Sequence, residues 1–423
     1  MYFDNLITMK TERINPKVYY NMSPQNFRLL SIGIILILVI SNFMGCTLFN
    51  DDDEEEKREG FNYETLVETI PSTFATELPI IEPMPIINTS KPRPLGNVVV
   101  IWYFEKNTVY RDFGGTLKFN LQNNGTDNLY IYQIGIKPEW RNSNSFGDSS
   151  TSGIYSEVGK YVNATEKKYI GMIYFPGPSQ SGEFKYSITF SAYSQNETGE
   201  WNDCGSQKWT TKTIQVDELP IPSKYKQYYN LPQYYDKIND VVDSTNKEVI
   251  NLAHQLAGKF PGPFNIYQAC AIFDYINSEI KYISDPSNTE NYWSAPDQTL
   301  AYGGDCEDFS TLLASLIISI GGSVRMYLTD SHAFIGLYIG NETNIKELTG
   351  AIQNYYQTDL YLFWFEDNLG FWLIMDSSAS VYLGGLPSGA SPVMKNYLGP
   401  EHYSWTWDFF ETENLYIVDV KPN

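Results

Sequence analysis

The chain has 423 residues, long enough for more than one domain, and a formal net charge of −21 at pH 7. This excess of acids argues against nucleic acid as a partner, because phosphate groups would be repelled. The four cysteines include no Cys-x-x-Cys pair and the three histidines form no cluster, so we expect no metal site and no cofactor.

Residues 1–46 predict export from the cytoplasm. An apolar run over residues 29–40 follows Arg28 and ends in Phe43-Met-Gly-Cys46. A basic flank, a short apolar core and a small residue before cysteine are typical of a lipoprotein signal peptide, with lipidation at Cys46. An uncleaved membrane anchor is the alternative, since the stretch from Leu29 to Gly45 has 17 residues, the short limit for crossing a bilayer. In both cases we expect the rest of the chain to be membrane-anchored on the extracytoplasmic face.

Residues 47–95 are expected to form a disordered linker. Residues 51–59 hold seven acids and two bases, and proline-rich sequence follows as far as Pro94. Such a segment has no periodic apolar pattern with which to build a core. We therefore expect a spacer that holds a globular part away from the membrane.

Over residues 96–218 the sequence pattern changes to that of short alternating strands separated by Gly, Asn and Ser turns. This spacing predicts an all-β sandwich of the immunoglobulin type, a spacer or recognition module without chemistry. The expected strands are 98–104, 116–121, 129–136, 169–174, 184–193 and 208–216, with Cys204 in a loop. Candidate glycosylation sites on an exported chain are Asn124, Asn163, Asn196 and Asn341.

Residues 219–423 follow a boundary at Glu218-Leu-Pro-Ile-Pro222 and form a second domain. Amphipathic helices are predicted over 234–257 and 265–282, packed around a third helix that starts near Asp305. Cys270 lies on the apolar stripe of its helix and is expected in the core, and a disulfide to Cys204 in the other domain is not expected. We expect four aromatic residues of the tail to close the sheet, with the lining of a substrate cleft as the alternative: Trp405, Trp407, Phe409 and Phe410.

Cys306 lies where a Gly-rich turn meets the third helix. Apolar residues recur at helical spacing after it, and Gly321-Gly322 ends the pattern. Asp305 is a favoured N-cap residue, so the thiol falls in the first turn, where unpaired N–H groups favour the thiolate. Glu307 and Asp308 oppose ionisation, so a histidine partner is needed. These acids should also resist burial, which argues against a merely structural cysteine.

His332 and Asp376 supply the other two groups that a cysteine acyl-transfer site needs. His332 begins an expected strand over 334–339, and Asp376 ends another over 371–375. The other histidines fit less well, because His254 lies on an amphipathic helix and His402 in a tail segment bounded by proline and glycine. The predicted triad is therefore Cys306, His332 and Asp376.

At these residues the chain resembles the transglutaminase-like superfamily, whose papain-related core carries cysteine at a helix start, then histidine and aspartate on successive strands. The matching blocks are Gly304-Asp-Cys-Glu-Asp308, His332-Ala-Phe334 and Trp372 to Asp376, and residues 291–300 resemble the microbial transglutaminase-like cysteine proteinases. The likeness covers residues 219–380. It departs in Phe334, where tryptophan is common, and in a short Cys-to-His spacing. It implies an α+β core of helices packed on an antiparallel sheet.

The resemblance also implies cysteine-dependent acyl transfer on protein amide bonds, through a thioester at Cys306 with His332 as base and Asp376 holding the imidazole. The backbone N–H of Cys306 is one expected oxyanion donor, and Gln298 or Trp293 is the second. We favour a peptidase or amidohydrolase acting on protein or peptide substrates at the cell surface. Protein-glutamine transamidation, a catalytically silent cell-surface binding protein and the oligomeric state all stay open.

Overall fold

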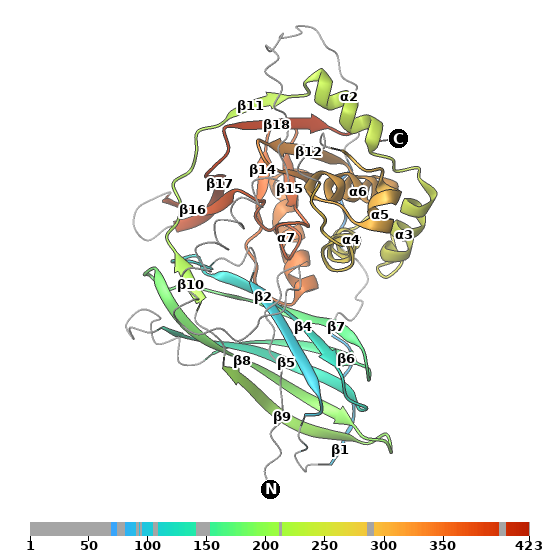
Figure 1. Ribbon diagram of the computed structural model, residues 1–423, viewed down its shortest axis with the longest axis vertical. Coiled ribbons are helices and arrows are strands. Elements are labelled where there is room, and N and C mark those ends of the chain that lie inside the picture. Colours follow the sequence, from blue (N-terminus) through green and yellow to red (C-terminus); the bar gives the residue numbers. More distant parts are fainter. Residues whose placement is uncertain are drawn as a thin grey trace. The chain divides into compact units, whose positions relative to one another are not determined.

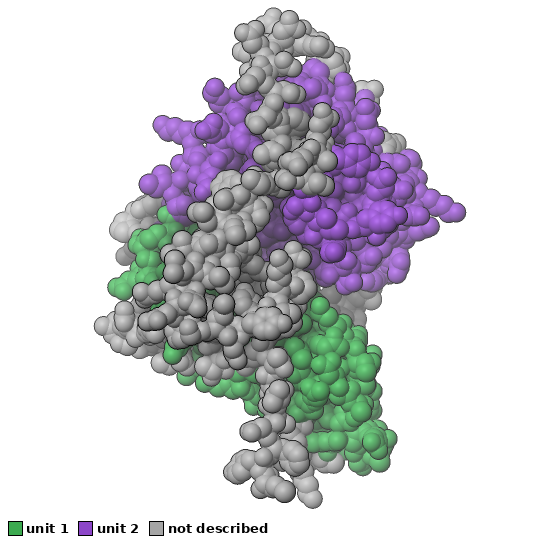
Figure 2. Space-filling view, viewed as in Figure 1, with its two compact units in different colours: residues 1–15, 76–219, 353–360 green, residues 16–75, 220–352, 361–423 purple. Residues whose placement is uncertain are grey.

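The structure, a computed structural model, describes residues 69–73, 81–89, 93, 95–104, 109–140, 153–210, 214–285, 292–396 and 403–422 (Figure 1). Within them the fold is mixed α+β, with several sheets and six helices. The chain divides into two compact units, coloured separately in Figure 2. Unit 1 takes Thr76–Leu219 and Gln353–Leu360, and unit 2 takes Pro220–Ile352 and Tyr361–Asn423 together with the described residues 69–73.

Unit 1 holds two sheets. One has the order β1-β9-β8-β10-β3, with β5 and β6 joined to it through β8, and the other has the order β2-β4-β7. Side chains from both sheets form one buried hydrophobic cluster. Within it, the ring centroids of Phe119 and Phe190 are 5.5 Å apart in an edge-to-face contact. The strands are β1 Ile87–Thr89, β2 Val98–Phe104, β3 Val109–Tyr110, β4 Gly115–Asn123, β5 Asn128–Trp140, β6 Ile154–Val162, β7 Lys167–Phe175, β8 Gly182–Gln195, β9 Trp201–Thr210 and β10 Ile214–Asp217.

The strands expected over 98–104, 116–121, 129–136, 169–174 and 184–193 are confirmed, and residues 208–216 contribute to β9 and β10. Two expectations for this region were wrong. Cys204 lies buried in β9 rather than in a loop. Residues 81–89 of the expected linker are ordered, because β1 pairs with β9 and Glu82 is bonded to Tyr130, Tyr161 and Lys168. Composition alone does not reveal such edge pairing.

Unit 2 is built on a six-stranded sheet of order β11-β18-β12-β13-β15-β14, in which only the β11–β18 pair is parallel among the described strands. Helix α6 packs against β12 and β13, and α3, α4 and α5 pack against α6. The strands are β11 Lys226–Tyr229, β12 Val324–Thr329, β13 Ala333–Tyr338, β14 Trp364–Glu366, β15 Phe371–Met375, β16 Ala390–Asn396, β17 Tyr403–Phe409 and β18 Asn414–Asp419. The helices are α2 Pro232–Val241, α3 Lys247–Ala257, α4 Ile266–Glu279, α5 Pro296–Tyr302, α6 Cys306–Ser319 and α7 Glu342–Tyr356, of which the residues from Gln353 belong to unit 1.

The helix expected over 234–257 is in fact two helices, α2 and α3. The carboxylate of Asp243 accepts hydrogen bonds from the backbone N–H groups of Thr245 and Asn246, which turns the chain. The side chain of Asn246 then caps α3 by accepting from Glu248 and Val249. These short polar side chains compete with the helical hydrogen bonds, and the apolar periodicity concealed the break. The helix expected over 265–282 is confirmed as α4, and Cys270 is buried in it.

The tail aromatic residues do not close the main sheet. Trp405, Trp407 and Phe409 lie in β17, which pairs with β16 in a separate two-stranded sheet. The strand that enters the main sheet is β18, beside β12. Asp330 accepts hydrogen bonds from the N–H groups of Glu413 and Asn414 and so directs the chain into that position.

The N-terminal signal or anchor with Cys46, most of the expected linker, and His402 lie outside the described residues. Of the helices in the part of the chain that the structure describes, none combines the length and the apolar character that crossing a bilayer requires.

Candidate active site

Cys306 is the first residue of α6, as the sequence predicts, with Asp305 at the N-cap position. The Gly-rich turn before it pairs with an extended segment, because Gly304 N–H donates to Lys281 and Ile283 N–H donates to Gly304. Gly303 has a φ of 85°, and a Cβ there would lie 2.2 Å from the carbonyl oxygen of Lys281. Only glycine fits this close approach of two backbones, so the turn fixes where α6 begins.

The acids around Cys306 are buried, contrary to the expectation that they would resist burial. Asp308 is held by backbone donors, since its carboxylate accepts from Ser294 at 2.6 Å and from Asp305 at 3.3 Å. Burial raises the pKa of Asp305 to about 6 and that of Glu307 to about 10. A carboxyl that keeps its proton avoids most of the cost of a buried charge, which is why these side chains can lie inside. Burial of the acids therefore does not distinguish a reactive cysteine from a structural one.

Three ligand atoms gather at the start of α6. Sγ of Cys306 lies 3.1 Å from Oε2 of Glu307, and one ligand atom each from Asp305, Cys306 and Glu307 all lie within 4.8 Å of one another. One oxygen of Asp305, Oδ1, is buried without a hydrogen-bond partner among the described residues. Two carboxyl groups and a thiol could hold a divalent cation once they have lost their protons. The sequence-based expectation of no metal site considered only cysteine pairs and histidine clusters, and so missed this group.

Replacing Glu307 with glutamine should raise the stability of the protein at neutral and alkaline pH. The folded state retains a proton on Glu307 that the unfolded state releases above pH about 4.5, so wild-type stability falls as the pH rises toward about 10. Glutamine cannot ionise, so the variant should lose this slope between pH 6 and 8; below pH about 6 the raised pKa of Asp305 gives both proteins a slope. Urea unfolding at pH 4, 6 and 8 in the presence of a chelator measures it. Glu248, exposed at the same position of α3, is the control, and Glu248→Gln should change stability little. A slope between pH 6 and 8 that is the same in wild type and Glu307→Gln would contradict the protonated state of Glu307.

His332 and Asp376 lie next to each other, at the ends of neighbouring strands. His332 immediately precedes β13 and Asp376 immediately follows β15, and the register that pairs Ile335 with Met375 places both at the same edge. Nε2 of the imidazole lies 2.7 Å from Oδ2 of Asp376. The ring is stacked on Phe334 at a centroid distance of 6.1 Å.

Asp376 is held in place by a set of donors that the sequence did not reveal. Oδ1 accepts from the hydroxyl of Ser378 at 2.8 Å and from the N–H groups of Ser378 and Ala379, and Oδ2 accepts from the N–H of Ser388 at 3.0 Å. Burial by itself would raise the pKa of Asp376, but His332 and these hydrogen bonds outweigh it and hold the pKa below its ordinary value. The carboxylate is therefore ionised and fixed in direction. The only sequence signal was the run Asp376-Ser-Ser, typical of a turn closed by an Asp side chain.

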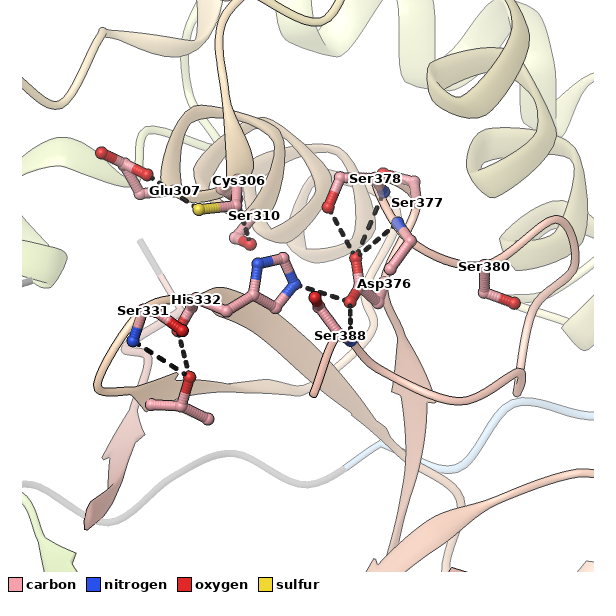
Figure 3. Close-up of polar contacts among 12 residues, drawn as sticks. Cys306, Glu307, Ser310, Ser331, His332, Asp376, Ser377, Ser378, Ser380 and Ser388 are labelled. Atoms are coloured by element: carbon pink, nitrogen blue, oxygen red, sulfur yellow. Dashed lines mark hydrogen bonds and ion pairs between the residues drawn. The ribbon is translucent and has the colours of Figure 1, made fainter. Parts of the chain in front are cut away.

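The imidazole lies between the start of α6 and the Asp376 carboxylate (Figure 3). Because Nε2 meets a carboxylate, it carries the proton, which leaves Nδ1 as the acceptor. Figure 3 shows this second nitrogen on the side of the ring that faces the Cys306 helix. The arrangement can accept a proton on the side of the sulfur and stabilise the resulting imidazolium.

The two candidate side chains for the oxyanion differ in their surroundings. Gln298 is exposed, and its Oε1 accepts from the Ala295 N–H and the Tyr292 hydroxyl, so it serves the start of α5. Trp293 is buried beneath Lys237, and its indole Nε1 has no hydrogen-bond partner among the described residues. An indole N–H that is buried without an acceptor makes Trp293 the better candidate.

The glycosylation candidates lie at turns and element ends. Asn124, Asn163 and Asn341 are exposed, and Asn196 is half-buried and bonded to Glu200. Their modification stays a prediction. Cys204 and Cys270 are buried and form no disulfide with each other.

No protein-family model and no curated protein matches this chain. Among solved structures, it is similar to the crystal structure of a "Putative Cysteine Protease from Cytophaga hutchinsonii", with 15% sequence identity over 62% of this chain and 81% of that one and a TM-score of 0.22. A TM-score this low does not establish a shared fold. The proposals below depend on the geometry of this chain.

Proposed function

We propose that this chain is a cysteine-dependent enzyme that transfers acyl groups from protein amide bonds, most directly a peptidase or amidohydrolase. The observation that carries the proposal is the 2.7 Å contact between His332 and the ionised, firmly held Asp376, at the sheet edge where α6 begins with Cys306. A buried His–Asp pair that turns its second nitrogen toward a cysteine at a helix start is the arrangement of a thiol acyl-transfer site.

In the proposed reaction, the reduced thiol of Cys306 passes its proton to Nδ1 of His332, and the sulfur attacks the amide carbon. A C–S bond forms, and the C–N bond breaks as the imidazolium returns the proton to the leaving amine. Asp376 keeps the ring in the required tautomer throughout. Water then attacks the thioester while His332 accepts its proton, and the acid and the thiol are released. The backbone N–H of Cys306 and the indole of Trp293 are the proposed donors to the oxyanion.

The finer assignments belong with this proposal. The order of cysteine, histidine and aspartate on one helix and two strands supports membership of the transglutaminase-like superfamily with a papain-like core. The two β-sheets with one shared core support an immunoglobulin-like sandwich in residues 96–218. The apolar segment before Cys46 supports a membrane-anchored, extracytoplasmic enzyme acting on cell-surface proteins. Membrane fractionation of wild type and Cys46→Ser tests the lipid anchor.

After reduction, iodoacetamide should alkylate Cys306 at least about tenfold faster than Cys204 or Cys270. All three cysteines are buried, so the difference reports on ionisation more than on exposure. Burial raises the pKa of the Cys204 thiol, whereas the start of α6 and His332 favour the thiolate of Cys306. Peptide mass spectrometry measures the three rates. His332→Ala should bring the rate at Cys306 down to that of the others, and equal labelling of all three thiols in the wild type would contradict the proposal.

The reaction itself is tested with the reduced full chain, a cell-surface protein extract and a labelled primary amine. Cleaved peptides or released ammonia indicate hydrolysis, and incorporated amine indicates transamidation. Cys306→Ala is the inactive control in both assays. Products that are the same with wild type and Cys306→Ala would leave the binding-protein alternative in place of the enzyme.

A further inference from the structure

The loop after β15 determines the direction in which Asp376 points. The hydroxyl of Ser378 and the N–H groups of Ser378 and Ala379 hold Oδ1, while Oδ2 meets the imidazole and the N–H of Ser388. The donors to Oδ1 all come from the residues directly after Asp376. The contact between Asp376 and His332 therefore depends on where the loop 377–380 is placed.

Asn277, on α4, is bonded to this loop at two points. Its side-chain Nδ2 donates to the carbonyl of Ser377 and to the carbonyl of Ser380, each at 2.9 Å. These two carbonyls stand at either end of the residues that hold Oδ1. One amide nitrogen that donates to a carbonyl at each end of this segment fixes the position of the loop relative to α4.

Helix α4 also packs against α6, the helix that begins at Cys306. A continuous set of contacts thus leads from the helix that carries the sulfur, through α4 and Asn277, to the loop that holds Asp376. Small displacements within such a site slow the reaction strongly, since a shift of about 1 Å can lower its rate about 100-fold. A side chain that fixes the distance between these two parts can govern the reaction without touching the substrate.

We infer that Asn277 is a positioning residue of the proposed acyl-transfer site: its amide holds the loop 377–380 so that Asp376 keeps His332 oriented toward Cys306. The inference rests on the proposed function. If Asn277 only stabilises the fold, its loss should lower the melting temperature and leave the chemistry of folded protein unchanged.

Asn277→Asp, of the same shape, replaces the two donors with an acceptor. We expect the alkylation rate of reduced Cys306, and kcat on any substrate found, to fall about 10- to 100-fold with KM changed less than about twofold. Asn277→Ala removes the same donors without adding a charge and is measured in parallel, so a misfolded aspartate variant does not decide the result. Asn239, half-buried on α2, is the matched control, because its Nδ2 also donates to two main-chain carbonyls, those of Tyr235 and Asp419. Asn239→Asp should leave both rates within about twofold of the wild type.

A double-substitution cycle separates positioning from a general loss of order. If Asn277 acts through Asp376, then adding Asn277→Asp to Asp376→Asn should lower the rate less than about twofold further. If Asn277→Asp lowered the rate by the same factor in the wild type and in Asp376→Asn, the inference would be overturned.

Proton NMR gives a readout that does not require activity. The imidazole N–H shared with Asp376 should give a low-field resonance in the wild type and in Asn239→Asp, and the resonance should be lost in Asn277→Asp and Asn277→Ala. A resonance that survives unchanged in both Asn277 variants overturns the inference. Failure of the proposed function looks different, because Cys306 would then react no faster than Cys204 and Cys270 while the resonance still depended on Asn277.

Discussion

Asp376→Asn should lower kcat about 10⁴-fold with little change in KM, provided that the chain is the proposed enzyme. The asparagine amide would present an N–H to Nε2 of His332 in place of a carboxylate. The imidazole would then move its proton to Nδ1, the nitrogen on the side of Cys306, and could no longer accept the thiol proton. Because the pKa of Asp376 lies below its ordinary value, the wild type should keep its carboxylate down to acidic pH, so the loss should appear across the neutral range. Steady-state kinetics at pH 6, 7 and 8 measure it.

Asp330→Asn is the matched control for this substitution. Asp330 lies two residues before His332, ahead of β13, and its described hydrogen bonds come from Glu413 and Asn414 at the start of β18. The same change of carboxylate to amide at that position should leave kcat within a few-fold of the wild type. If Asp376→Asn kept most of its activity while folding normally, Asp376 would not be the group that orients the base.

Arg325→Met should lower the free energy of unfolding by about 3–5 kcal/mol, the largest effect on stability that we expect from one substitution. Arg325 is buried on β12, paired with both Asp367 and Asp419, and its guanidinium lies 4.2 Å above the ring of Trp372. Removing the cation would leave two poorly exposed carboxylates without their counter-charge. The loss arises mainly from these stranded charges, since a buried ion pair adds little by itself.

Urea unfolding followed by near-ultraviolet circular dichroism measures this change. Arg111→Met is the control, because Arg111 is also paired with two acids, Asp112 and Glu218, but all three side chains are much more exposed. Its effect should stay near zero, as is usual for surface pairs. Adding Asp367→Asn and Asp419→Asn to Arg325→Met should restore part of the lost stability. No recovery would mean that packing on Trp372, rather than the stranded charges, explains the cost.

Local patterns in the sequence predicted much of this fold. The helix starting at Cys306 was predicted from apolar spacing, an N-cap residue and a Gly-Gly stop, all of which lie within a few turns of one another. Most alternating strands of unit 1 were predicted for the same reason, but β6 and the short strands β1 and β3 were not. The break between α2 and α3 was missed because apolar periodicity continues across it, and only the hydrogen bonds of Asp243 and Asn246 end the helix.

The site likewise combines features that local sequence predicts with features that depend on long-range contacts. Chemical type and order were enough to propose Cys306, His332 and Asp376 as candidates, and His332 and Asp376 do lie in contact. Nothing local indicated that Asn277 would meet a loop 100 positions later, or that Ser388 would donate to Asp376. The buried, protonated state of Glu307 was also not foreseen, since its charged side chain looks like a solvated one until the surrounding chain is in place.

Residue type and neighbours a few positions away were enough to predict which groups are available for chemistry and where most helices and strands lie. Which groups meet, and in what state of charge, became known only from the folded chain. Strand register brings His332 to Asp376, β18 enters the sheet from the far end of the chain, and burial sets the protonation of the acids beside Cys306. These outcomes depend on distances between remote segments and on exclusion of water, and both exist only once the chain has folded.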